Sequence, residues 1–125
     1  VLSADRLVYP TCLNKYLTNV KTHSDAYLYM AMNQAKRGNN EKAVDYFKRS
    51  LMYNTTDWKV YYKFYEVYLA MGANEKALYN LSMVIELGQR KSEFYKVRSE
   101  LYTAVGDNFR AKQDLEYAGN VTVAK

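Results

Sequence analysis

Hydrophobic residues in this chain recur at spacings of three and four positions, the period of a helix with one apolar face. Two such stripes stand in the middle of the sequence: Tyr61, Phe64, Tyr65 and Tyr68, followed by Ala77, Leu81, Val84 and Ile85. A short segment that begins with Gly72 separates them. This arrangement predicts two helices joined by a tight turn, and similar stripes before and after it predict an all-α chain.

The segment between these stripes occurs three times, at residues 38–43, 72–77 and 106–111. The copies are spaced by 34 residues, and a fixed period of this size is typical of a protein built from stacked supersecondary units. Three residue types keep the same register in every copy: Gly38, Asn40 and Ala43; Gly72, Asn74 and Ala77; Gly106, Asn108 and Ala111.

Each of these positions has a physical role in a helix-turn-helix unit. Glycine enters the left-handed region without a Cβ clash, so it ends the first helix. The asparagine two residues later is predicted to cap the second helix by accepting a free N–H. Alanine lets the two helices cross closely. We therefore divide the chain into repeats at residues 24–57, 58–91 and 92–125, the last of which includes a C-terminal tail.

Residues 1–23 are predicted to be a helical extension or a degenerate repeat that caps the array. We expect a helix to start at Pro10, and Ser24 to cap the first helix of repeat one. Gly88 is expected to end the second helix of repeat two, and Gly119 to end the last helix. Because the chain begins with Val1, we expect a processed or excised fragment.

Composition adds few constraints. No segment of the 125 residues approaches the ~20 apolar residues of a membrane span. A net charge of +5 and 14 tyrosines are compatible with an anionic partner such as RNA. A solvated surface of mixed charge explains the net charge equally well, and packing in the core explains the tyrosines. Cys12 and His23 are the only residues of their kinds. We therefore predict no disulfide within the chain, no metal site, no cofactor and no catalytic residues.

The repeated pattern resembles the tetratricopeptide repeat (TPR) over residues 24–119. The resemblance implies a right-handed superhelix, an α-solenoid whose first helices line a concave groove. The tryptophan that is usual at the fourth position of such repeats is replaced here by Tyr27, Tyr61 and Tyr95. We expect each of these rings to pack on the next repeat, since each repeat contacts its neighbours.

Repeat two has a narrower resemblance, which rests on Tyr61-Tyr62, on residues 67–72 and on the leucines and β-branched residues of its second helix. It is similar to the N-terminal repeats of endoplasmic-reticulum cochaperones that end in a J domain, among them the cellular inhibitor of the double-stranded-RNA-activated protein kinase. This resemblance implies client holding, delivery to a lumenal Hsp70 and a place in the endoplasmic reticulum; otherwise the cytoplasm is expected. The His-Pro-Asp motif of a J domain does not occur in this chain.

Six residues on the first helices are predicted to face the groove and to bind unfolded polypeptide: Leu28, Tyr29, Met32, Tyr62, Glu66 and Leu69. Exposed apolar groups of this size mark partner sites, and methionine adapts to varied shapes. The alternative is that the N-terminal segment folds over the patch in repeat one. Repeat three is expected to offer mostly charge.

Many TPR cochaperones hold the acidic C-terminus of cytosolic Hsp70 or Hsp90 in a carboxylate clamp of lysine, arginine and asparagine. The matching positions here are Leu28, Met32, Lys63, Glu93 and Val97. Only Lys63 is cationic, so we predict that the clamp is missing. A sequon at Asn54 lies in a predicted turn and is a possible glycosylation site, whereas Asn80 is expected to be in a helix.

Three functions remain open at this stage. The first is a non-catalytic, client-binding domain of a lumenal Hsp70 cochaperone. The second is a scaffold or adaptor that binds one folded partner. The third is an RNA-binding helical repeat, whose affinity would fall steeply with salt.

Overall fold

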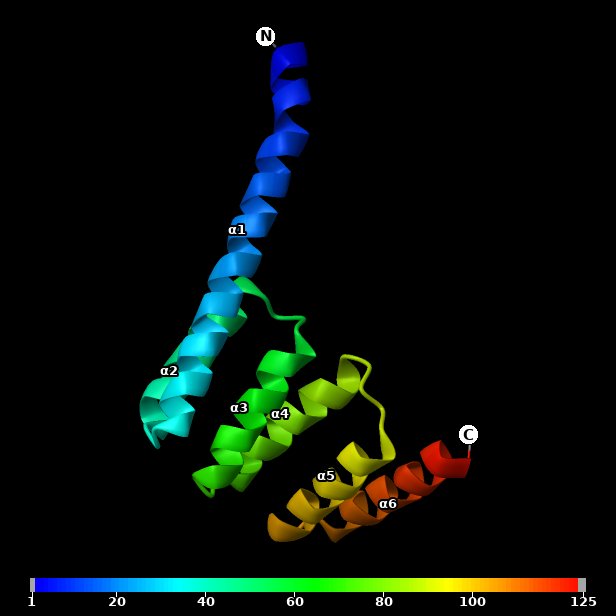
Figure 1. Cartoon of the computed structure of the whole chain (residues 1–125). Helices are drawn as coiled ribbons and strands as arrows, with labels where there is room; N and C mark the ends of the chain where they lie inside the picture. Colours follow the sequence, from blue (N-terminus) through cyan, green and yellow to red (C-terminus); the bar gives the residue numbers. More distant parts are fainter. Residues whose placement is uncertain (1, 124–125) are drawn as a thin grey trace. The chain divides into compact units, whose positions relative to one another are not determined.

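In the computed structural model, the backbone is described for residues 2–123 and the side chains for residues 19–121. Over this range the structure is helical and contains no strand. The helices pair in sequence order (Figure 1): α1 (Leu2–Lys36) with α2 (Asn40–Tyr53), α3 (Trp58–Ala70) with α4 (Asn74–Glu86), and α5 (Ser92–Ala104) with α6 (Asn108–Val123). The chain divides into two compact units, Val1–Thr55 and Thr56–Lys125, and each is described by itself.

The predicted turn glycines are confirmed. Gly72 has a φ of 74°, in the left-handed region that favours glycine, and it follows the last turn of α3. Gly38 and Gly106 have φ values of 80° and 86° at the equivalent turns, and Gly88 has a φ of 109° after α4. The predicted glycine ends of these helices are therefore correct.

The predicted asparagine caps are wrong by one residue. Asn40, Asn74 and Asn108 are the first residues of α2, α4 and α6 and do not cap them. Aspartates cap two helices instead. The Asp57 side chain accepts a hydrogen bond from the Lys59 backbone N–H at 3.0 Å, and the Asp107 side chain accepts one from the Arg110 N–H at 3.1 Å. In the last repeat, Asp107, the residue directly before the asparagine, therefore caps the helix.

Helix α1 is one continuous helix of 35 residues, so the predicted helix starts at Pro10 and Ser24 are both wrong. At ~1.5 Å per residue it is about 50 Å long, and its N-terminal part extends far beyond the end of α2 (Figure 1). Ser24 is buried, and its hydroxyl donates to the Ser50 carbonyl at 3.2 Å; the Ser50 hydroxyl donates to the Ser24 carbonyl at 2.8 Å. This pair joins α1 to α2, which explains why a serine lies inside the helix rather than at its start.

The core of the first unit lies between α1 and α2. Ala31, Ala43 and Phe47 are fully buried there, so the small residue expected at position 43 does allow a close crossing. The Tyr27 ring stacks on Tyr46 and Tyr53, at centroid distances of 6.2 and 5.8 Å. These ring partners belong to its own helix pair, and packing of Tyr27 on the next repeat, which lies in the other unit, stays a prediction.

The second unit contains two helix pairs, and α4 of one packs against α5 of the other. Ala77 and Ala111 are buried at the helix crossings, as predicted. Tyr95 packs with Ile85 of the preceding repeat and with Ala118 of its own repeat. The ring of repeat three therefore contacts the preceding repeat, not a following one.

Two further predictions fail at the end of the chain. Helix α6 continues through Gly119 to Val123, so Gly119 does not end it; residues 124–125 of the predicted tail lie outside the described range. A glycine inside a helix costs only about 1 kcal/mol relative to alanine, so the helix can continue through it. The 34-residue period makes Leu115 equivalent to Leu81 and so predicts the same environment, yet Leu115 is 56% exposed and Leu81 is fully buried.

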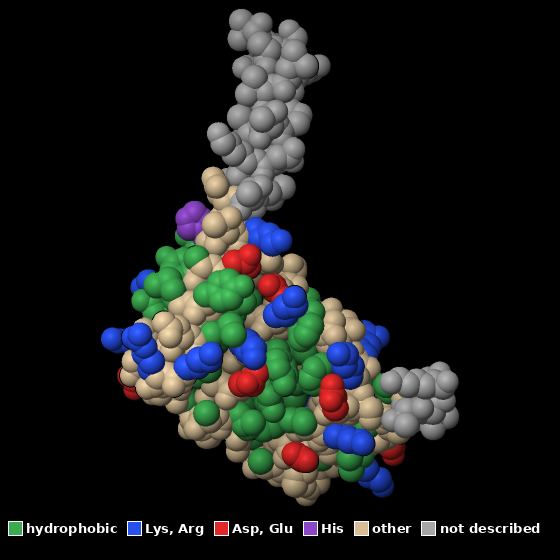
Figure 2. Space-filling model, in the orientation of Figure 1, with side chains coloured by type: hydrophobic (Ala, Val, Ile, Leu, Met, Phe, Trp, Pro, Cys, Tyr) green, Lys and Arg blue, Asp and Glu red, His purple; other side chains and the backbone are tan. Residues whose placement is uncertain are grey.

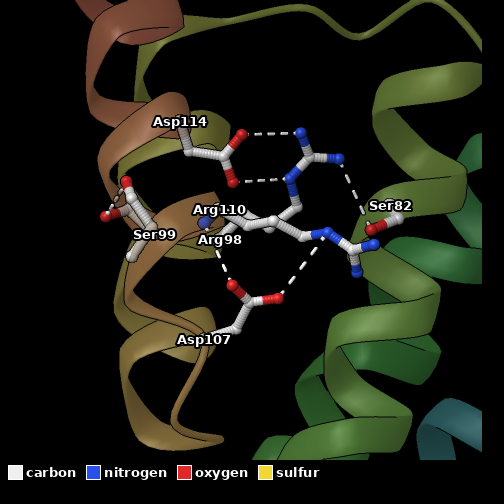
Figure 3. Close-up of polar contacts among 7 residues, drawn as sticks. Ser82, Arg98, Ser99, Asp107, Arg110 and Asp114 are labelled. Carbon is white, nitrogen blue, oxygen red and sulfur yellow. Dashed lines mark hydrogen bonds and ion pairs between the residues drawn. The ribbon is translucent and has the colours of Figure 1, made fainter.

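A buried ion pair ties α5 to α6 (Figure 3). The Arg98 guanidinium donates to both carboxylate oxygens of Asp114, from Nε at 2.8 Å and from Nη2 at 2.7 Å. Nη1 also lies 3.4 Å from the Ser82 hydroxyl of α4. Burial by itself would lower the pKa of Arg98, but the hydrogen bond and charge of Asp114 outweigh it and raise that pKa. The pair thus connects three helices of the second unit.

Among the helices described, none has the length and apolar character that crossing a membrane requires.

Candidate functional site

The second unit contains a hollow of about 280 Å³ between α3, α4 and α5. Trp58, Tyr62 and Tyr65 lie at spacings of four and three residues on α3, so they share one helix face. Helix α5 contributes the opposite wall, and one leucine of α4 forms part of the lining. The remaining lining residues are Leu81, Glu93, Phe94 and Val97.

Tyr62 is the central ring of this hollow. Its centroid lies 6.4 Å from Trp58, 5.8 Å from Tyr65 and 5.6 Å from Phe94, in edge or tilted arrangements. Aromatic pairs favour these arrangements over face-to-face stacking. Tyr65 is buried, whereas Trp58, Tyr62 and Phe94 are only half-buried. The four rings therefore hold one another in place and still present apolar surface to solvent.

Charged groups surround the rings. The Lys63 ammonium lies 3.3 Å from the Glu66 carboxylate and 5.9 Å from the centroid of the Tyr62 ring. The Lys91 ammonium lies 5.9 Å from the Phe94 centroid. Glu93 is exposed at the edge of the hollow. Burial raises the pKa of the Tyr65 hydroxyl, with smaller contributions from Tyr62, Glu66 and Glu100, so this phenol stays neutral at physiological pH.

Three of the predicted binding residues lie on α1 in the first unit. Tyr29 is 70% exposed, while Leu28 and Met32 are half-buried and share a helix face at a spacing of four. The alternative that the N-terminal segment folds over them is wrong for the described backbone, because residues 2–23 continue the same helix. A helix does not fold back onto its own side chains.

The other three predicted residues lie on α3 in the second unit. Tyr62 lines the hollow, Glu66 is paired with Lys63, and Leu69 is 43% exposed outside the lining. The two sets belong to different units, each described by itself, so a single groove formed by all six residues stays a prediction.

The sequence interpretation missed Trp58, Phe94 and Val97 as site residues. Repeat three was expected to contribute mostly charge, but Phe94 and Val97 form an apolar wall of the hollow. Their spacing of three residues on α5 matches that of Tyr62 and Tyr65 on α3. This shared spacing is the signal that could have indicated two facing apolar stripes.

Hydrophobic side chains also reach the surface elsewhere, with lysines, arginines and carboxylates among them (Figure 2). The hydrophobic side chains with the highest exposed fractions are Tyr29, Met52, Tyr79 and Phe109. None of these four lines the hollow. Exposed apolar residues that stand singly are normal on a protein surface. The hollow differs because its aromatic residues are contiguous and form a concave surface.

The predicted sequon residues differ in their surroundings. Asn54 caps the end of α2 in an extended conformation, with Thr55 and Thr56 exposed after it. Asn80 is 4% exposed inside α4 and donates to the Lys76 carbonyl at 2.9 Å. The described residues contain no group of three His, Cys, Asp or Glu side chains placed to hold a metal ion.

Comparison with solved structures gives the fold class. The second TPR of Spaghetti (RPAP3), bound to the HSP90 peptide SRMEEVD, matches with a TM-score of 0.71 at 20% identity, over 86% of this chain and 98% of that chain. MamA matches with a TM-score of 0.73 at 22% identity, over 83% of this chain and 61% of that chain. The Yersinia enterocolitica type III secretion chaperone SycD, in complex with a peptide of the translocator YopD, matches with a TM-score of 0.66 at 20% identity, over 78% of this chain and 74% of that chain.

These matches show that the chain has the all-α helical-repeat fold of TPR proteins. At this level of identity they establish the fold alone. No protein-family model matches the sequence, and no curated protein matches it.

Proposed function

We propose that this chain is a non-catalytic protein-binding domain that holds an extended segment of polypeptide. The observation that carries the proposal is the hollow of the second unit, where four contiguous aromatic rings are pre-positioned and three of them remain half-exposed. Aromatic anchors in a preformed concave site are typical of the residues that dominate binding energy in protein interfaces. A site that is ordered before binding also loses less entropy when it binds.

Proteins with the same fold support this proposal. The RPAP3 and SycD structures each contain a bound peptide. This is an analogy at the level of fold, and the specific residues of the hollow carry the argument for this chain. The lining that would contact such a segment is mostly aromatic and apolar, with Glu93 as its charged residue.

The finer proposal is that the bound polypeptide is unfolded, with Leu28, Tyr29 and Met32 of α1 as a second contact. Two separate apolar contacts on one chain would raise the overall affinity for a long flexible ligand that reaches both. Delivery of the client to a lumenal Hsp70 rests on the resemblance of repeat two alone, and it requires a J domain outside residues 1–125.

Trp58 provides a direct test, because it is the only tryptophan of the chain and lines the hollow. A reduced, carbamidomethylated and therefore unfolded polypeptide without tryptophan is the probe. We expect its titration to change the Trp58 emission, and Tyr62→Ala to weaken binding about tenfold or more.

Tyr79→Ala is the matched control, because Tyr79 is 63% exposed on α4 and does not line the hollow. We expect its affinity to stay within about twofold of the original. Equal affinity of the Tyr62→Ala variant and the original chain, with the helical signal retained in both, would overturn the proposal. Capture of one folded partner without affinity for the unfolded probe would favour the scaffold alternative.

The lumenal setting has its own test. In a chain that passes through the endoplasmic reticulum, we expect a glycan at Asn54, whose segment is extended, and none at Asn80, which is buried in a helix. Asn120 is exposed and begins a further sequon, so every chain in this test carries Asn120→Gln. Digestion with an amidase that removes N-linked glycans should shift the gel mobility of this parent chain and of its Asn80→Gln variant, but not of its Asn54→Gln variant. An unshifted parent chain would remove the support that Asn54 gives to this setting.

A further inference from the structure

Some charged groups around the hollow form ion pairs, and others do not. Glu66 is neutralised by Lys63 at 3.3 Å. Glu93, which lines the hollow, and Glu100, whose charge acts on Tyr65, form no ion pair among the described residues. Lys96 lies between Glu93 and Glu100 on α5 and is exposed. Among the residues that the structure describes, it pairs with neither carboxylate. Two carboxylates therefore remain available on the α5 side.

The position of Glu93 follows from the helix. Glu93 and Val97 are four residues apart, and Glu100 follows three residues later, so all three share one face of α5. The apolar wall at Val97 is thus bordered on both sides along the helix by a carboxylate. Glu93 also lies in the first turn of α5, where the helix dipole favours a negative charge.

The rings themselves attract cations. Lys63 and Lys91 both place their ammonium groups 5.9 Å from ring centroids of the hollow, those of Tyr62 and Phe94. This is within the distance at which the negative face of an aromatic ring stabilises a positive charge. The hollow therefore combines aromatic faces with the unpaired carboxylate of Glu93, and both features favour a cationic ligand group.

We infer that the hollow selects polypeptide segments in which a lysine or arginine side chain stands next to an apolar residue. The inference rests on the proposed function and adds the chemical class of the ligand. The aliphatic stem of the basic side chain would pack on Val97, and its charged end would lie between the rings and Glu93. The volume of about 280 Å³ lies near the lower end of the range for small-molecule pockets, roughly 300–1,000 Å³, and leaves room for an inserted side chain.

The same charges disfavour an acidic segment. A ligand carboxylate at the hollow would face Glu93, while Lys63 is already engaged by Glu66. Like charges placed together across an interface lower the affinity for the wrong partner and so contribute to specificity.

Three tryptophan-free peptides test the inference on the full chain. They are identical apart from one central residue, which is lysine, its uncharged analogue norleucine, or glutamate, between apolar neighbours. With Trp58 emission as the readout, we expect the lysine peptide to bind about three- to tenfold tighter than the norleucine peptide, and the glutamate peptide to bind weakest. The lysine preference should shrink in high salt, because exposed charges are screened.

Two variants test whether the preference for the lysine peptide arises in the hollow. Glu93→Gln should reduce the ratio of the lysine-peptide affinity to the norleucine-peptide affinity. Glu116→Gln, at an exposed position on α6, is the control and should change neither. Equal binding of the lysine and norleucine peptides would overturn the inference and leave the proposed function intact. If none of the peptides changes Trp58 emission or binds by calorimetry, both the inference and the proposed function fail.

Discussion

The two units of this chain use the same helix pair differently. The first unit has one pair, in which α2 covers only part of a helix of 35 residues. The second unit has two pairs, and the packing of α4 on α5 joins them. Only the second unit brings the faces of two first helices together, with Tyr62 of α3 and Phe94 of α5 at 5.6 Å. In the second unit, the concave site is thus formed by two adjacent repeats.

The units also hold their helices together with different chemistry. Two serine hydroxyls join α1 to α2, and each bonds to a backbone carbonyl. An arginine–carboxylate pair joins α5 to α6, with Asp114 2% exposed. A neutral hydrogen bond contributes about 1 kcal/mol, whereas breaking a buried ion pair leaves a charge without a partner, which costs several kcal/mol. The second unit should therefore be far more sensitive to the loss of its polar link.

The largest effect is expected for Asp114→Ala. It leaves the Arg98 guanidinium buried without its carboxylate, and should lower the free energy of unfolding by about 3–5 kcal/mol. Urea unfolding followed by circular dichroism measures this. The control is Arg110→Ala, which breaks the exposed pair with Asp107 and should cost less than about 1 kcal/mol. A loss at Asp114 no larger than the control would show that the pair does not stabilise the second unit.

A smaller effect is expected from two leucines at equivalent repeat positions. Leu81→Ala removes a fully buried side chain and should cost about 2–5 kcal/mol. Leu115→Ala removes one that is 56% exposed and should cost less than about 1 kcal/mol. The same urea measurement compares them. Similar losses would contradict the difference in packing between the middle and the end of the array.

The smallest effect is expected for Ser50→Ala in the first unit. The Ser24 hydroxyl keeps its bond to the Ser50 carbonyl, so the variant loses the bond to the Ser24 carbonyl and should cost about 1 kcal/mol. Hydrogen exchange of α2 amides is a suitable measurement, because it reports on this unit locally. A loss above about 3 kcal/mol would mean that the Ser50 hydroxyl contributes more to the packing of α1 on α2 than one neutral hydrogen bond.

Local patterns in the sequence predicted much of the fold. Gly72 adopts the positive φ that its turn needs, and Ala77 is small enough for its helix crossing. Both roles can be predicted from a single repeat. Three copies in register then predicted the pairing of helices. These features depend on residues near one another in the chain, which a pattern of spacing captures.

The failed predictions depend on partners distant in sequence. Ser24 has the chemistry of a helix cap, yet it pairs with Ser50, 26 residues away, and the helix runs through it. Leu115 has the same spacing as Leu81, but exposure depends on the helices that pack around it. Phe94 was missed because a hollow is formed by two helices together and is not visible in either one alone.

The most direct test of the central claim is to map binding residue by residue. Side-chain NMR spectra of the full chain, recorded with and without the unfolded polypeptide, report which residues change environment. We expect shifts at Tyr62, Phe94 and Val97, and none at the exposed controls Tyr79 and Phe109. Binding accompanied by unchanged signals from the hollow would contradict the account.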